Sequence, residues 1–173
     1  MNLRDQHKSN RPLYNSILTG LFYFFFCWSI DFGEATVDLF YFLMIFLPGL
    51  SFPLTTSYYN VGSLNKLKLR ILFHLALSAL IYYGVVLLFA TEGLIPFGVV
   101  LAAFSGSLLI LLVTKYLLRK NISILQIILT AIASGLTFLI CDIFGRYGFF
   151  IGVSVLLWTL VNGLSMNIEY RRS

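Results

Sequence analysis

Residues 98–120 read GVVLAAFSGSLLILLVTKYLLRK, and this stretch decides the fold class. Within this stretch no charged residue precedes Lys115, and Arg119 and Lys120 complete a basic cluster at its end. About 20 apolar residues form a helix that crosses the ~30 Å hydrocarbon core, and a helix satisfies its own backbone groups in lipid. Basic residues beside such a run mark the cytoplasmic side. The stretch therefore predicts a transmembrane helix that ends at the cytoplasmic face.

The rest of the chain has the same character. Of its 173 residues, 59% are hydrophobic and 11% are charged, whereas soluble domains are about one quarter charged. This composition indicates an integral membrane protein in contact with the lipid bilayer. The net charge of +5 is not a nucleic-acid signal, because the basic residues occur in short clusters between apolar runs. We expect no direct contact with nucleic acid.

Further apolar runs predict an all-α integral membrane protein with one domain over residues 1–173. We expect six transmembrane helices, paired as three hairpins, between the cytoplasmic tails 1–12 and 167–173. The predicted spans lie at about 13–30, 37–54, 67–90, 94–118, 122–141 and 147–166. The first two runs are the shortest, and Pro48 and Pro53 interrupt the second, so a re-entrant pair with four or five spans is the alternative. No small-residue cleavage site follows the first run, which is therefore expected to remain as a mature helix.

The distribution of charge predicts the orientation. On a six-span topology one side holds eleven of the twelve basic residues: Arg4, Lys8, Arg11, Lys66, Lys68, Arg70, Lys115, Arg119, Lys120, Arg171 and Arg172. The other side holds five of the seven acids: Asp31, Glu34, Asp38, Glu92 and Asp142. The positive-inside rule then places both termini in the cytoplasm, and we expect a multi-pass protein of the bacterial inner membrane.

The last outer loop, CDIFGRYG at residues 141–148, places an acid near a base. Asp142 and Arg146 are spaced for an i,i+4 pair if the preceding helix continues, although Gly145 favours a turn. Arg146 is the only base predicted on the outer side. Such a pair can form an outer-face functional site. The simpler interpretation is a charge-balanced turn or a contact between subunits.

Polar residues inside the spans are few, and no motif for catalysis, for a cofactor or for a metal site occurs. His74 is a candidate residue for proton transfer or ligand binding, but an interfacial histidine bonded to a neighbour is the simpler interpretation. Gln126 and Asn162 lie within spans, where they either bond across helices or bind a neutral solute. Cys27 and Cys141 form a disulfide in an oxidising periplasm only if their helices are neighbours; otherwise they are buried thiols.

Small residues recur at helical spacing in two of the predicted spans. Gly98, Ala102 and Gly106 follow one another every four residues, and Gly148 and Gly152 open the last span. This spacing lets helix backbones approach closely in lipid. The resulting seam either joins helices of one chain or joins subunits of a homo-oligomer.

These features predict a non-enzymatic membrane subunit that forms a homo-oligomer and recruits or anchors a cytoplasmic protein. Its candidate contacts are the basic inner loops with Lys66, Lys68, Arg70, Lys115, Arg119 and Lys120. A small-solute or ion transporter, a channel, or the substrate-binding subunit of an importer is the alternative, and a membrane enzyme is the least supported. By analogy of size and class alone, such chains occur among toxin-immunity proteins and membrane subunits of anti-phage defence systems.

Overall fold

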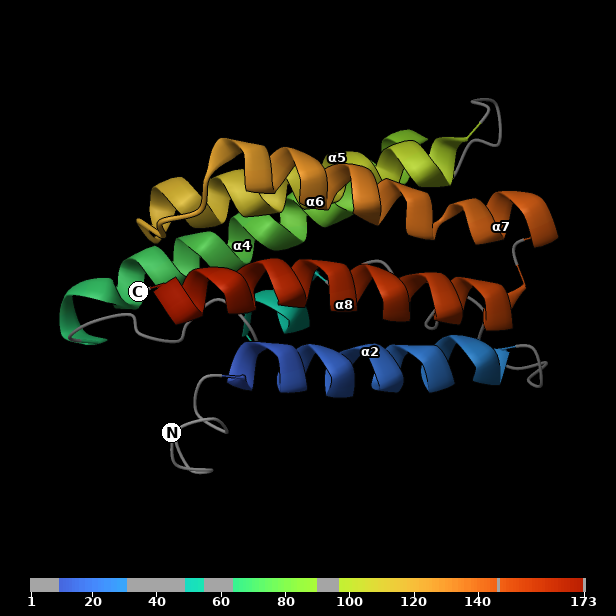
Figure 1. The fold of residues 1–173 in the computed structure, drawn as a ribbon, viewed down its shortest axis with the longest axis horizontal. Coiled ribbons are helices and arrows are strands. Elements are labelled where there is room, and N and C mark those ends of the chain that lie inside the picture. Colours follow the sequence, from blue (N-terminus) through green and yellow to red (C-terminus); the bar gives the residue numbers. More distant parts are fainter. Residues whose placement is uncertain (1–9, 31–48, 55–63, 90–96, 146, 173) are drawn as a thin grey trace.

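The computed structural model describes residues 10–30, 49–54, 64–89, 97–145 and 147–172, and every regular element among them is a helix (Figure 1). The helices are α2 (Arg11–Ile30), α4 (Leu64–Phe89), α5 (Gly98–Leu117), α6 (Ile124–Thr137), α7 (Leu139–Phe144) and α8 (Gly148–Arg172). Residues 49–54 are also helical. The all-helical fold class is confirmed for this part of the chain.

Among the described residues, four segments are long and apolar enough to cross a membrane: Leu69–Leu88, Gly98–Leu117, Ile124–Phe144 and Gly148–Ile168. They correspond to the last four predicted spans. α2 has a comparable length but is not one of the four. Of the predicted span 37–54, only residues 49–54 lie within the described part. The structure thus supports a multi-pass membrane protein with four such helices among its described residues.

The long helices run up and down in one bundle (Figure 1). α2 packs along α8, α8 packs on α6, α6 on α5, and α5 on α4. One end of the bundle therefore holds the start of α2, the start of α4, the α5–α6 connection and the end of α8. We call it the basic end because it carries Arg11, Arg70 and Arg119.

The fifth predicted span differs in detail, because it consists of two helices that meet at Phe138. The Phe138 N–H donates to the Gly135 carbonyl at 3.0 Å, three residues back, and the Thr137 hydroxyl donates to the Ser134 carbonyl. This tighter turn interrupts the regular pattern before α7 resumes it. α7 ends at Gly145, whose φ of 96° is readily adopted only by glycine.

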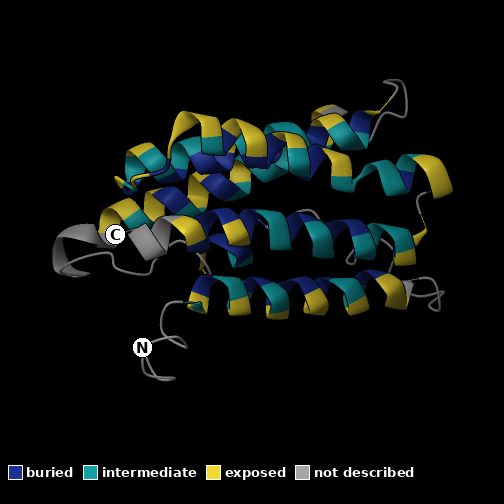
Figure 2. Cartoon of the chain, viewed as in Figure 1, coloured by how far each residue is buried: buried dark blue, intermediate teal, exposed yellow. Residues whose placement is uncertain are grey.

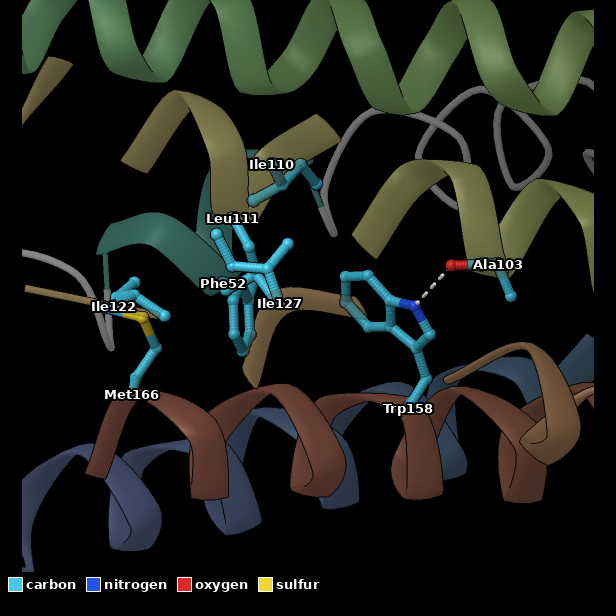
Figure 3. Close-up of a cluster of buried hydrophobic side chains, with 8 residues drawn as sticks. All are labelled: Phe52, Ala103, Ile110, Leu111, Ile122, Ile127, Trp158 and Met166. Atoms are coloured by element: carbon cyan, nitrogen blue, oxygen red, sulfur yellow. Dashed lines mark hydrogen bonds between the residues drawn. The ribbon is translucent and has the colours of Figure 1, made fainter. Parts of the chain in front are cut away.

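The core lies where residues 49–54 enter the bundle between α5, α6 and α8 (Figure 3). Phe52 is fully buried, and its ring meets the Trp158 ring edge-on at a centroid distance of 5.4 Å. The Trp158 indole N–H donates to the Ala103 carbonyl at 3.3 Å, which satisfies its one polar atom. Ile110, Leu111, Ile122, Ile127 and Met166 complete the cluster.

Many large apolar side chains are exposed on the outer surface of the bundle, and Figure 2 shows where the chain is exposed. Leu69, Leu80 and Leu88 of α4 are each more than 60% exposed, and Leu125 of α6 is 66% exposed. A patch of this extent is unfavourable in water but compatible with lipid chains. The exposed apolar faces therefore indicate contact with a lipid bilayer.

Glycines set the contact between α2 and α8. A Cβ on Gly152 would lie 2.8 Å from the Phe24 carbonyl oxygen, and one on Gly163 would overlap the Ser16 side chain. A Cβ on Gly20 would likewise overlap the Thr159 hydroxyl. The two backbones therefore approach closely. Gly152, a predicted seam residue, lies inside this contact within a single chain.

The other predicted seam also faces the interior. Gly98, Ala102 and Gly106 are buried on α5, and a Cβ on Gly106 would lie 3.9 Å from Val85 of α4. Ala102 and Gly106 line a largely apolar cavity of about 70 Å³ between α4, α5 and α8. Small residues in this stripe therefore leave space between helices, in contrast to the tight contact of α2 with α8. Gly148 is buried at the start of α8.

Candidate functional site

A fully buried polar cluster joins α5, α6 and α8 near the middle of their apolar segments. The Asn162 side-chain amide lies 2.9 Å from the Ser107 hydroxyl, 2.8 Å from the Ser134 hydroxyl and 2.9 Å from the Trp158 carbonyl. Ser107, Ser134 and Asn162 are all 0% exposed. In lipid, side chains of this kind bond across helices rather than remain unpaired. The predicted intramembrane Asn162 therefore ties three helices together.

This cluster keeps one unused acceptor. Asn162 Oδ1 is buried and has no hydrogen-bond partner among the described residues. A buried carbonyl oxygen without a partner costs free energy, and a bound polar molecule would recover it. A neutral donor group that reached Asn162 Oδ1 would therefore gain a hydrogen bond.

His74 forms a second link, between α4 and α5. Its Nε2 lies 2.8 Å from the Thr114 hydroxyl oxygen, and both side chains are buried. The Thr114 hydroxyl donates to the Ile110 carbonyl at 2.8 Å. A hydroxyl has one hydrogen, so His74 Nε2 donates to Thr114. No group of three metal-ligating side chains occurs in the described part of the chain.

Gln126 forms the third link, at the basic end. Its Nε2 donates to the Ser165 carbonyl at 2.8 Å and to the Ser165 hydroxyl at 3.0 Å, which joins α6 to α8. Gln126, Thr130 and Ser165 line an open groove of about 430 Å³ between these helices. Its rims are apolar, with Leu125, Leu129, Leu164 and Ile168.

The outer-face pair is only half described. Asp142 lies in α7, half-buried, and its Oδ2 has no hydrogen-bond partner among the described residues. Arg146 lies outside the described residues, so the ion pair remains a prediction. Cys27 and Cys141 are both buried and do not form a disulfide with each other, and the Cys141 sulfur lies 3.2 Å from the Ser154 hydroxyl oxygen. The interpretation as packed thiols is the one that the structure shows.

The predicted basic contacts are not equivalent. The Lys115 ammonium donates to the Ile122 carbonyl and so braces the α5–α6 connection. Arg119 is exposed there with a φ of 55°, a left-handed conformation that side chains other than glycine seldom adopt. Lys120 is half-buried, and Arg70 is exposed on the second turn of α4. Lys66 and Lys68 lie in the first turns of α4, but their side chains lie outside the described part.

Several residues of this network were not singled out from the sequence. Thr114, Ser134 and Ser165 are the partners of His74, Asn162 and Gln126. Their signal in the sequence is a single hydroxyl within an apolar run, which many transmembrane helices carry without such a role. Comparison with known protein families, with curated proteins and with solved structures gives no match to this chain.

Proposed function

We propose that the chain is a non-enzymatic subunit of the bacterial inner membrane that forms a homo-oligomer and anchors a cytoplasmic protein, for example in anti-phage defence or toxin immunity. One observation carries the proposal: the predicted intramembrane polar residues His74, Gln126 and Asn162 each form hydrogen bonds to a neighbouring helix. Arg70 and Arg119, in contrast, are exposed at the basic end. A bundle with its polar groups used internally and its charge displayed at one end is suited to anchoring.

The orientation belongs to the same proposal. Because α2 packs along α8, a membrane that α8 crosses is also crossed by α2. Six spans with both termini in the cytoplasm then place the basic end on the cytoplasmic side. Fusions of alkaline phosphatase and green fluorescent protein test this. Fluorescence is expected after residues 120 and 172, and phosphatase activity after residue 145. Phosphatase activity at either basic-end fusion would refute the orientation.

Partner capture from native membranes tests the anchoring surface. Charge reversal at Lys66, Lys68 and Arg70 is expected to weaken recovery of a cytoplasmic partner, with partners identified by mass spectrometry. Reversal of Arg11, exposed at the same end but on α2, is the control for a charge change elsewhere at the basic end. Unchanged capture in the triple variant would show that another surface is used.

The homo-oligomer must use a surface other than the α5 stripe, because Ala102 and Gly106 are buried within one chain. The exposed face of α4, with Leu72, Phe73 and Leu80, is the best surface for this contact. Cysteines introduced at Leu72 and Leu80 are expected to cross-link two copies in native membranes, whereas one at Leu125 on α6 is not. Recovery of only monomers in mild detergent would refute the oligomer.

A neutral-solute transporter or channel is the second candidate, and the buried, unpartnered Asn162 Oδ1 is the observation that favours it. Uptake into vesicles should then be lost in Asn162→Leu and in Gln126→Leu, and should persist in Leu136→Ala on the outer surface of α6. Equal uptake by all three variants and by protein-free vesicles would eliminate this candidate.

A further inference from the structure

The groove between α6 and α8 has the dimensions of one membrane leaflet. It extends from Ser123 to Ala133 along α6 and from Val161 to Ile168 along α8. Ten residues of helix rise about 15 Å, which is half of the ~30 Å hydrocarbon core. The groove therefore runs from the basic end to about the middle of the membrane, a depth that one acyl chain also reaches.

The walls of the groove change in character along this depth. Leu129, Leu164 and Ile168 are exposed along its rims, which suits an acyl chain. Gln126 and Ser165 lie toward the basic end and are bonded to each other. Thr130 lies one turn further in, and its hydroxyl donates to the Gln126 carbonyl of its own helix. The Gln126 amide donates through Nε2, and its Oε1 has no hydrogen bond among the described residues. An amphipathic ligand with its polar part at the basic end matches this order.

Positive charge lies at the mouth of the groove. Ser123 lines its end, and Arg119 and Lys120 precede Ser123 in the same connection. α8 continues for one turn beyond Ile168 to Arg172. Glu169 is the only acid in residues 115–133 and 161–173, against five bases there. Basic pockets between transmembrane helices on the cytoplasmic side bind anionic lipid headgroups.

From this order of charge, polar atoms and apolar rims, we infer that the α6–α8 groove binds an anionic phospholipid of the cytoplasmic leaflet. The phosphate lies at Arg119 and Lys120, and one acyl chain lies between α6 and α8. This site goes beyond the proposed anchoring role, and it requires only that α6 and α8 cross the membrane with the basic end in the cytoplasm.

The test uses purified full-length protein in nanodiscs of phosphatidylcholine with or without phosphatidylglycerol, without any cytoplasmic partner. Phosphatidylglycerol retained on the protein is measured by native mass spectrometry. The wild type is expected to retain phosphatidylglycerol in preference to phosphatidylcholine. In Arg119→Gln/Lys120→Gln, retention should fall about 30-fold, the effect expected for two charges beside an anionic headgroup. Arg11→Gln, which removes an exposed charge at the same end away from the groove, should retain it like the wild type.

A second variant tests the apolar part of the site. Ala133→Phe narrows the inner end of the groove and is expected to reduce retention, whereas Ala76→Phe on the exposed face of α4 is not. Equal retention of the two lipids by the wild type, or full retention by Arg119→Gln/Lys120→Gln, would overturn the assignment. Cross-linking of two copies through Leu129→Cys would overturn it as well, because a second chain would then occupy the groove.

Discussion

Gly152 of α8 lies so close to Phe24 of α2 that a Cβ on Gly152 would come within 2.8 Å of the Phe24 carbonyl oxygen. The obstructing atom belongs to a backbone, so no side-chain rotation relieves the contact. Gly20 and Gly163 lie in the same contact, one on each helix. Two helices far apart in the sequence are thus held backbone to backbone, and van der Waals packing of this kind is a main driving force for helix association in lipid.

Gly152→Ala is therefore expected to destabilise the protein by about 1–3 kcal/mol, the usual cost of overpacking a tight site. Thermal unfolding of the purified protein in detergent measures the change. Gly84→Ala is the matched control, because a Cβ at Gly84 meets no atom within 4 Å. The control should be neutral or slightly stabilising, since alanine favours a helix over glycine. Equal loss in both variants would show that α2 and α8 are not in this contact.

Gly163 allows a test by compensation. A Cβ on Gly163 would overlap the Ser16 side chain, and the next atom, the Pro12 carbonyl oxygen, lies 3.7 Å away. Gly163→Ala alone should lower the unfolding temperature by several degrees. Adding Ser16→Gly removes the obstructing atoms and should restore part of this loss. A double variant less stable than the sum of the two single changes would contradict the contact.

The sequence predicted the elements far better than their partners. α5 was predictable because an uncharged apolar run determines a membrane helix locally, and its end agreed within one residue, Leu117 against Leu118. The break at Phe138 was not, since it depends on a hydrogen-bond shift at a residue that is neither proline nor glycine. For the site, Asn162 was predictable as a polar residue in a span. Its partners Ser107 and Ser134 depend on which helices meet, and helix pairing is not encoded in any single segment.

The Asn162 cluster predicts a loss of stability on removal of the amide. Asn162→Leu leaves the Ser107 and Ser134 hydroxyls without their shared partner, and side-chain hydrogen bonds inside membranes contribute about 0.6–2 kcal/mol each. We expect a loss of about 1–3 kcal/mol, measured by thermal or denaturant unfolding in micelles. A cycle with Ser134→Ala should show coupling, because both changes remove the same hydrogen bond. Strict additivity would show that the two side chains do not interact.

Thr114→Val isolates the link between α4 and α5. Valine keeps the shape of threonine but lacks the oxygen that lies 2.8 Å from His74 Nε2. The buried Nε2–H of His74 then loses this acceptor, which costs about 1–2 kcal/mol. Thr130→Val is the matched control, since its hydroxyl donates to the Gln126 carbonyl within α6, and the loss of this bond should cost about 0.5 kcal/mol or less. If His74→Leu in the Thr114→Val background restores stability, the loss of the acceptor for His74 Nε2 is the cause. Equal stability of Thr114→Val and the wild type would mean that α4 does not depend on this bond.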